Sequence, residues 1–194
     1  MILYLHGFKS SPQSFKARQL GDTMAAQGRA GDYLCPQLPA SPAAAIALAL
    51  ELVRDVPAHD LTVIGSSLGG FYATWIAEHL TCRAALLNPA VQPPRDLEQY
   101  VGISSAYHSD QPFEFKRVYI DELRALTIPA ITRPERYLLL AATGDEVLDW
   151  REMQAHYPHA QQVIIQGSDH GIADFADHLA TVLAFCDQTP VAMT

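Results

Sequence analysis

The sequence contains few cysteines and no long apolar run. Its three cysteines, Cys35, Cys82 and Cys186, are far apart, which excludes a disulfide framework and a Cys-x-x-Cys metal site. Such cysteine usage is typical of a reducing compartment, and we expect a cytoplasmic protein. No stretch approaches the roughly 20 apolar residues that are needed to cross a bilayer. The sequence therefore predicts neither disulfides nor a membrane span.

Basic residues are also scarce. Lys and Arg number 13 against 21 Asp and Glu, which gives a formal net charge of −8. The basic residues are scattered along the chain, whereas contacts with phosphates need clusters, so we expect no nucleic-acid partner. No group of His, Asp and Glu has the spacing of metal ligands, so the sequence predicts no metal and no cofactor.

The sequence does contain a regular alternation of strand and helix patterns. Hydrophobic residues make up 49% of 194 residues, which suits a single globular domain over residues 1–194. Short apolar runs rich in β-formers predict parallel strands buried on both faces. The expected strands are Ile2–Leu5, Asp32–Cys35, Leu61–Gly65, Arg83–Leu87, Tyr137–Ala142 and Gln162–Gln166. Helical patterns lie between them, so we predict an α/β fold with a doubly wound, mainly parallel sheet of about six strands.

Two Ser-Pro pairs predict where helices begin, because Ser is a good N-cap and Pro suits the first helical position. Ser11-Pro12 precedes a helical pattern at Phe15–Gln27, and Ser41-Pro42 precedes another at Ala43–Val53. An apolar stripe at helical spacing from Ile172 to Cys186 predicts the last helix.

The segment from 89 to 135 interrupts this alternation. It shows no clear strand, is rich in proline and aromatic residues, and is too long for an ordinary connection. We interpret it as a lid insertion whose aromatic residues Phe113 and Phe115 bind substrate. The alternative is a helical excursion whose aromatic residues only pack against the sheet.

A Gly-x-Ser-x-Gly motif lies at Gly65–Gly69, between a predicted strand and a predicted helix. This context is the one that a nucleophile elbow requires, with a serine in a strained turn and small residues two positions to either side. Gly65 and Gly69 flank Ser67 in this way, whereas bulky Ile64 and Leu68 would flank Ser66. The motif therefore predicts Ser67 as a nucleophile.

A serine nucleophile needs a base and an orienting carboxylate. His170 follows the last predicted strand in a Gly-bounded loop, which is where the base belongs in the chain order Ser, acid, His. Asp145 follows the Tyr137–Ala142 strand and is the predicted acid, with Glu146 and Asp149 as rivals. Asp169 adjoins His170, but neighbouring side chains diverge, so we expect it to point to solvent.

Acyl transfer also needs donors for a developing oxyanion. The backbone N–H groups of Leu68, after the nucleophile, and of Phe8, after the first strand, are the predicted donors. Gly7 permits the tight turn before Phe8. The side chain of His6 is expected to fix this loop rather than to react.

Together these motifs resemble the α/β-hydrolase superfamily. The opening Tyr4–Pro12, the elbow Gly65–Thr74, Leu86–Ala90 and Thr143–Asp149 are most similar to the small bacterial esterases of the YqiA type, over nearly the whole chain. The resemblance implies a carboxylic-ester hydrolase with a Ser-Asp-His triad and no cofactor, with acyl-CoA thioesters as further candidate substrates. It also implies a reduced fold that lacks the first two strands of the superfamily.

Three functions remain open on the sequence alone. The leading one is an esterase acting on a small-molecule ester through an acyl-enzyme. A thioesterase would use the same residues with a different leaving group. A ligand receptor or interaction module on a hydrolase fold is the non-enzyme alternative, since a fold does not fix a function. Acyl length and oligomeric state are left open as well, and a monomer is compatible with the sequence.

Overall fold

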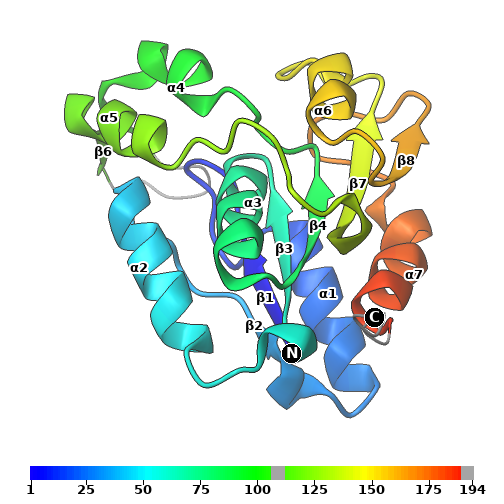
Figure 1. The fold of residues 1–194 in the computed structure, drawn as a ribbon. Coiled ribbons are helices and arrows are strands. Elements are labelled where there is room, and N and C mark those ends of the chain that lie inside the picture. Colours follow the sequence, from blue (N-terminus) through cyan, green and yellow to red (C-terminus); the bar gives the residue numbers. More distant parts are fainter. Residues whose placement is uncertain (106–111, 189–194) are drawn as a thin grey trace.

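The computed structural model describes residues 1–105 and 112–188. Its centre is a six-stranded parallel sheet in the order β2-β1-β3-β4-β7-β8 (Figure 1). The strands are β1 (Ile2–Leu5), β2 (Tyr33–Leu34), β3 (Thr62–Ser66), β4 (Arg83–Leu87), β7 (Tyr137–Ala142) and β8 (Gln161–Ile165). The predicted fold class is confirmed, and β1, β4 and β7 have the predicted bounds. β2 is two residues shorter than expected, because only Tyr33 and Leu34 pair with β1.

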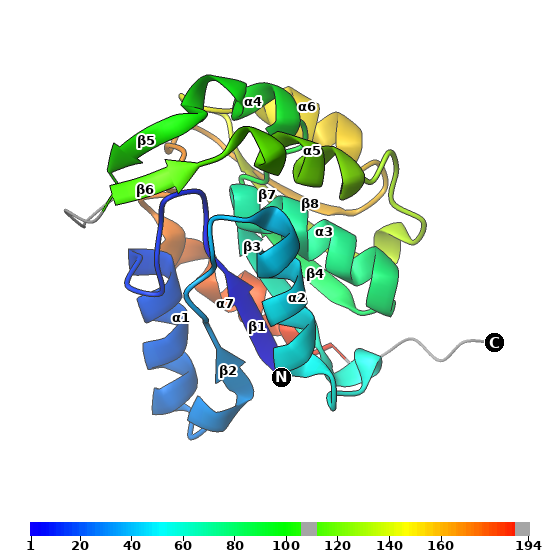
Figure 2. The same ribbon diagram turned by 90° about the vertical axis from the view of Figure 1, so that its left-hand side faces the viewer.

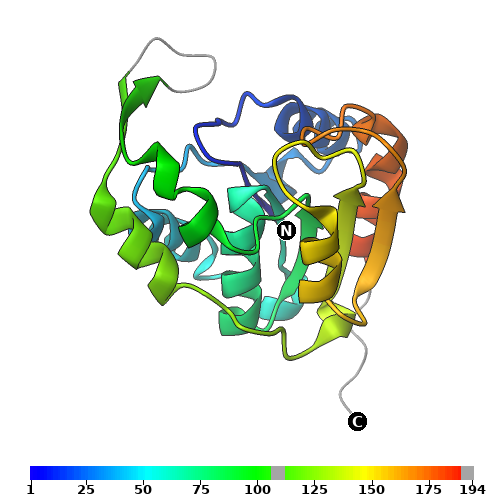
Figure 3. The same ribbon diagram turned by 90° about the horizontal axis from the view of Figure 1, so that it is seen from above.

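Helices cover both faces of the sheet, which explains the continuous apolar runs of the central strands. α1 (Phe15–Ala26) and α7 (Phe175–Cys186) cover one face, while α2 (Pro42–Val53), α3 (Leu68–Leu80) and α6 (Trp150–His156) cover the other (Figure 3). Every residue of β1 and β7 is buried. Burying a large apolar side chain stabilises a fold by about 1.5–3 kcal/mol, so these strands anchor the sheet.

The two predicted helix starts have different outcomes. Ser41 caps α2 as expected, because its Oγ accepts a hydrogen bond from Ala44 N at 3.2 Å. The expected cap at Ser11 is wrong, since the N-cap residue of α1 is Ser14. Ser11 instead begins a turn, in which its carbonyl accepts from Ser14 N at 3.0 Å. A Ser-Pro pair suits a turn as well as a helix start, and here the turn is formed.

The insertion between β4 and β7 lies above the carboxyl ends of the strands (Figure 2). It contains α4 (Pro93–Asp96), a 3-10 turn at Glu98–Tyr100, β5 (Gly102–Ser105), β6 (Pro112–Phe115) and α5 (Arg117–Ala125). The expectation of no strand here is wrong, because β5 and β6 pair antiparallel as a separate two-stranded sheet. Strands of four residues that pair only with each other leave too short a pattern for sequence reasoning to detect.

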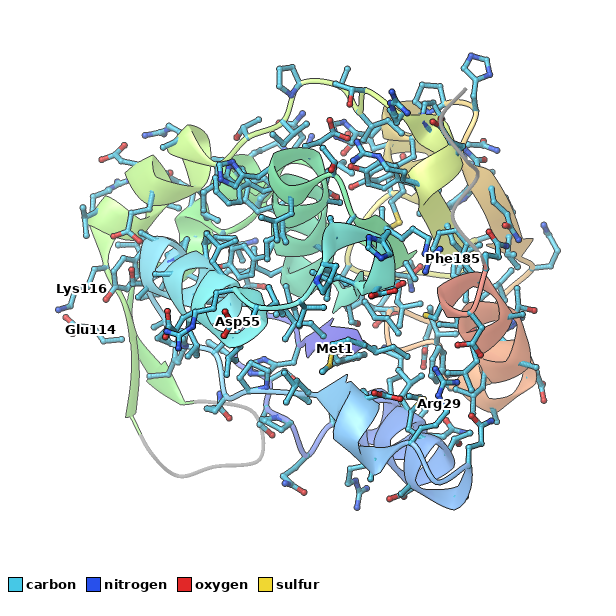
Figure 4. The ribbon with its side chains drawn as sticks, turned by 60° about the horizontal axis from the view of Figure 1, so that its bottom comes forward. Met1, Arg29, Asp55, Glu114, Lys116 and Phe185 are labelled. Atoms are coloured by element: carbon cyan, nitrogen blue, oxygen red, sulfur yellow. The ribbon has the colours of Figure 1, made fainter. Side chains whose placement is uncertain are left out.

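The helices of the insertion, α4 and α5, bind to α6 and α2, two of the helices that cover the main sheet. The Glu122 carboxylate on α5 accepts hydrogen bonds from Ser41 Oγ at 2.7 Å and from Ala43 N at 2.9 Å, at the start of α2. Arg95 in α4 forms a bidentate ion pair with Glu152 of α6. On the outer side of β6, Glu114 and Lys116 lie 3.7 Å apart and face away from the molecule (Figure 4). No helix within the described residues is long and apolar enough to cross a membrane.

Candidate active site

Ser67 occupies the sharp turn between β3 and α3. Its backbone has φ 54° and ψ −120°, a strained conformation for a residue with a side chain. A Cβ added at Gly65 would collide with the Gly69 backbone, and a Cβ added at Gly69 would collide with the Leu5 carbonyl. These contacts are the physical reason for the two glycines. Ser67 thus lies at the turn, and Ser66 is a buried residue of β3.

His170 lies between Ser67 and Asp145. Its Nε2 is 3.0 Å from Ser67 Oγ, and its Nδ1 is 2.8 Å from Asp145 Oδ2. The side chain of Asp145 is fully buried, and its Oδ1 accepts two backbone hydrogen bonds, from Val147 N and Leu148 N, at 2.8 Å each. These donors fix the orientation of the Asp145 side chain, with Oδ2 turned towards His170 Nδ1. The lone pair of Nε2 then faces the serine hydroxyl.

The other carboxylates near the site have different partners. Glu146 accepts a hydrogen bond from the backbone N–H of His170 at 3.0 Å, and Asp149 caps α6 by accepting from Arg151 N at 2.9 Å. Neither contacts the imidazole. Asp169, which we expect to point to solvent, is half-buried, and its Oδ1 accepts an exposed hydrogen bond from Ala173 N at 3.0 Å. The side chain bends back along its own loop, a common pattern for Asp ahead of a helix.

The loop after β1 lies directly against Ser67. A Cβ built on Gly7 would be 3.2 Å from Ser67 Cβ and 3.7 Å from its Oγ, so only glycine lets the loop approach this closely. Within residues 1–105 and 112–188, neither the Phe8 N–H nor the Leu68 N–H donates to a protein acceptor. The two N–H groups that we predict to bind the oxyanion thus make no hydrogen bond within these residues.

The His6 side chain holds this loop in place. It is buried, its Nδ1 lies 3.0 Å from the Gly7 carbonyl, and its Nε2 accepts from Leu38 N at 3.0 Å. Burial lowers the pKa of His6, so the imidazole is neutral and its Nδ1–H donates to Gly7. The predicted role of His6 as a support for the loop agrees with this geometry.

A small cavity opens beside Phe8 and Leu68, whose N–H groups are the predicted oxyanion donors. Its volume is about 160 Å³, and its walls include Phe8, Leu38, Leu68, Tyr72 and Phe113. Phe113, one of the two predicted substrate-binding residues, thus reaches the cavity. Phe115 does not, because it is 0% exposed and belongs to the hydrophobic core. Its ring packs edge-on against Phe8, with centroids 5.1 Å apart.

Sequence reasoning missed two buried polar residues behind His170. Asn88, after β4, donates from Nδ2 to the carbonyls of Asp169 and His170, and its Oδ1 accepts from Ala142 N at 2.8 Å. Lys16, on α1, donates from Nζ to the Gly171 carbonyl. The Asn-Pro pair after a predicted strand is a weak signal for Asn88, whereas Lys16 leaves none. No group of three or more possible metal ligands occurs in the described part of the chain.

Comparison with known proteins places this site in a family. The model of "Uncharacterised protein family (UPF0227)" matches residues 1–187. The chain belongs to this family. The UPF0227 match includes all the residues of the candidate site, from the loop after β1 to His170.

Solved structures show that this UPF0227 chain has the α/β-hydrolase fold. The mouse alpha/beta hydrolase domain-containing protein 10 is 18% identical with a TM-score of 0.70, over 96% of this chain and 89% of that one. A structure of the metagenome-derived lipolytic enzymes LipS and LipT gives 18% identity, a TM-score of 0.69 and coverage of 95% and 92%. An esterase domain from Rhodothermus marinus is 20% identical with a TM-score of 0.62, over 93% of this chain and 82% of that one. At these identities the likeness concerns the fold.

Proposed function

We propose that this protein is a serine esterase, in which residues 1–194 act as one domain that hydrolyses carboxylic esters through an acyl-enzyme on Ser67. The observation that carries the proposal is the continuous series of hydrogen bonds from Asp145 through His170 to Ser67 Oγ, at 2.8 and 3.0 Å. Both distances lie within the range in which a base can accept the proton of its nucleophile.

The chemistry follows from these positions. Ser67 Oγ attacks the ester carbonyl carbon while His170 Nε2 accepts the hydroxyl proton, and the Asp145 carboxylate stabilises the resulting imidazolium. The carbonyl oxygen becomes an oxyanion that accepts hydrogen bonds from the N–H groups of Phe8 and Leu68. His170 then protonates the leaving alcohol. Water attacks the acyl-enzyme with His170 again as base, and the acid is released.

The acyl group of the ester fits the cavity beside Phe8 and Leu68. His170 must reach the leaving oxygen, so the leaving group lies on the histidine side, and no residue of the histidine loop lines the cavity. Its walls include the apolar groups that acyl recognition requires, among them Phe8, Leu38 and Phe113, together with the polar residues His6, Lys9, Ser10 and Gln37. The volume of 160 Å³ is close to that of the roughly 150 Å³ cavity known to bind benzene. An acyl chain of about six carbons fills such a space, with Phe113 as one wall.

A fluorophosphonate probe tests the nucleophile directly, because it is attacked by an activated serine and stays bound. We expect the adduct on Ser67, no labelling of Ser67→Ala, and labelling retained in the matched variant Ser66→Ala. Turnover should be measured on esters from acetyl to octanoyl and on the corresponding acyl-CoA thioesters, since the same residues serve both leaving groups. Ser67→Ala should lower kcat on the preferred substrate by roughly 10⁴-fold or more.

Two results would contradict this proposal. An adduct on Ser66, or one that persists in Ser67→Ala, would exclude Ser67 as the nucleophile. Labelling of Ser67 without turnover of any ester or thioester would favour a binding module on a hydrolase fold.

A further inference from the structure

The loop that carries His170 has a strained backbone. Ser168 and Ile172, on either side of the histidine, have φ values of 60° and 53°. Such values are uncommon for any residue with a side chain, and for a β-branched residue such as Ile they are outliers. A strained loop keeps its conformation only when contacts from the rest of the molecule hold it.

Three consecutive carbonyl oxygens of the loop accept hydrogen bonds from two buried side chains. Asn88 Nδ2 donates to the carbonyls of Asp169 at 3.0 Å and His170 at 3.1 Å, and Lys16 Nζ donates to the next carbonyl, that of Gly171. Asn88 is 0% exposed and Lys16 is 6% exposed. The two side chains come from different elements, because Asn88 follows β4 of the sheet and Lys16 lies on α1, which covers one face of the sheet.

Lys16 is a costly residue to place here. Burying an ammonium group is unfavourable, and the hydrogen-bond partner of Lys16 is a neutral carbonyl rather than a carboxylate. Burial lowers the pKa of Lys16 to about 8, although the negative charges of Asp169 and Asp145 oppose the shift. A methionine would fill the same space without this cost. The fold alone therefore gives little reason for a lysine at this position.

We propose that Lys16 and Asn88 are positioning residues that hold the His170 loop so that the imidazole faces Ser67. The inference rests on the proposed function, because it assigns the pair to the geometry of the base. Fixing the carbonyls on both sides of the His170 Cα restricts where its ring lies between Asp145 and Ser67. A displacement of about 1 Å in a reacting group can cost about 100-fold in rate.

The decisive variant is Lys16→Met, which keeps the length of the side chain and removes the donor and the charge. We expect kcat on a short ester to fall roughly 10- to 100-fold, with KM within about twofold of the wild type. Because the buried charge is gone, the melting temperature should stay the same or rise. Lys16→Arg, which keeps a cationic donor, should recover most of kcat. Arg18→Met, which removes an exposed cation from the same helix, is the matched control and should change neither value.

A pH profile separates positioning from general support of the fold. Above pH 8 Lys16 loses its proton, and a hydrogen bond from a neutral donor is roughly half as strong as one from a charged donor. Wild-type kcat should therefore decline severalfold between pH 8 and 9.5, and the Lys16→Met profile should lack this decline. The charged groups that act on Lys16 are Asp169 and Asp145, both in the loops around the site.

Asn88 has its own test. Asn88→Asp keeps the oxygen that accepts from Ala142 N but replaces the donor with an acceptor, which repels the two loop carbonyls. Its kcat should fall at least as far as that of Lys16→Met. The His170 Nδ1–H resonance, which reports the hydrogen bond to Asp145 without substrate, should shift or broaden in both variants.

The outcomes distinguish the two proposals. Failure of the proposed function appears in the wild-type enzyme, as absent turnover or as labelling that does not need Ser67. Failure of the positioning proposal appears only in the variants. An unchanged kcat and an unchanged Nδ1–H resonance in Lys16→Met would overturn it. A parallel loss of kcat and melting temperature would instead make Lys16 a residue that supports the whole fold.

Discussion

The site at the strand ends and the insertion above it are held together by different forces. Around the site, hydrogen bonds and close backbone contacts fix each group, as at the buried side chain of Asp145 and at Gly69 against the Leu5 carbonyl. The insertion is held mainly by aromatic contacts at Phe8, by the hydrogen bonds of Glu122 to the start of α2, and by ion pairs such as that of Arg95 with Glu152, whose side chains are both more than 40% exposed. Exposed ion pairs contribute only about 0–1 kcal/mol each. We therefore expect mutations around the site and mutations in the insertion to affect chemistry and selectivity separately.

Asp145→Asn tests the site at the strand ends, and we expect it to have the largest effect. Asp145→Asn keeps the shape of the side chain but removes the charge that orients and stabilises the imidazole. We expect kcat to fall by about 10³- to 10⁴-fold, because the histidine is then held in the wrong tautomer. Steady-state kinetics on one good ester measures this, with Glu146→Gln as the matched control. A smaller loss in Asp145→Asn than in Glu146→Gln would reassign the acid.

Phe115→Ala tests whether the insertion contributes to the core. Phe115 is fully buried and contacts Phe8 and Tyr119, so its removal leaves a cavity. The free energy of unfolding should fall by about 3–5 kcal/mol, and all esters should be affected alike. Denaturant unfolding gives the stability, and kinetics on acetyl and octanoyl esters gives the selectivity. A change in selectivity without a loss of stability would place Phe115 in contact with substrate.

The pH dependence of stability tests the buried charge beneath the site. The pKa of Lys16 is lowered from 10.5 to about 8 in the folded protein, so between these values the unfolded chain binds more protons than the folded one. Stability from this group therefore rises as pH increases through this window. Between pH 7.5 and 9.5 the unfolding free energy of the wild type should rise relative to Lys16→Met by roughly 2 kcal/mol. A constant difference between the two proteins would mean that Lys16 is solvated.

Phe113→Ala tests the contribution of the insertion to selectivity, and we expect it to have the smallest effect. Phe113→Ala opens one wall of the 160 Å³ cavity without removing a fully buried side chain. We expect the preference between octanoyl and acetyl esters to shift by about tenfold towards the longer chain. The rate on the acetyl ester and the melting temperature should hardly change. Equal losses on both esters would show that Phe113 supports the site as a whole.

The sequence predicts well those features that depend on neighbours in the chain. The four central strands of the sheet are buried apolar runs, whereas the edge strands β2 and β8 are partly exposed; β1, β4 and β7 have the predicted bounds. The turn at Ser67 is sterically crowded, and the glycines at positions 65 and 69 indicate this crowding in the sequence. The structure also brings together Ser67, Asp145 and His170, although their chemical roles stay predictions.

The features that the sequence does not predict depend on distant contacts or on very short patterns. The β5–β6 hairpin has strands of four residues, and α6 has seven residues. Lys16 donates to a carbonyl 155 positions away, and nothing around it in the chain marks that contact. Phe113 and Phe115 belong to the same short strand, β6. Phe115 is a core residue and Phe113 lines the cavity, and this difference depends on their packing in the folded protein rather than on their positions in the sequence.

The Glu122 carboxylate adds to the cost of moving α5 away from α2, beyond the burial of Ile120 and Leu123 in the core. It accepts from Ser41 Oγ and from Ala43 N, so it completes the cap of α2 from another part of the chain. A movement of α5 away from α2 would break both hydrogen bonds and leave the Ala43 N–H without its partner. Losing a helix cap costs about 1 kcal/mol, which lowers the population of an open insertion by only about fivefold. Glu122→Gln would thus raise the frequency of opening rather than release the insertion.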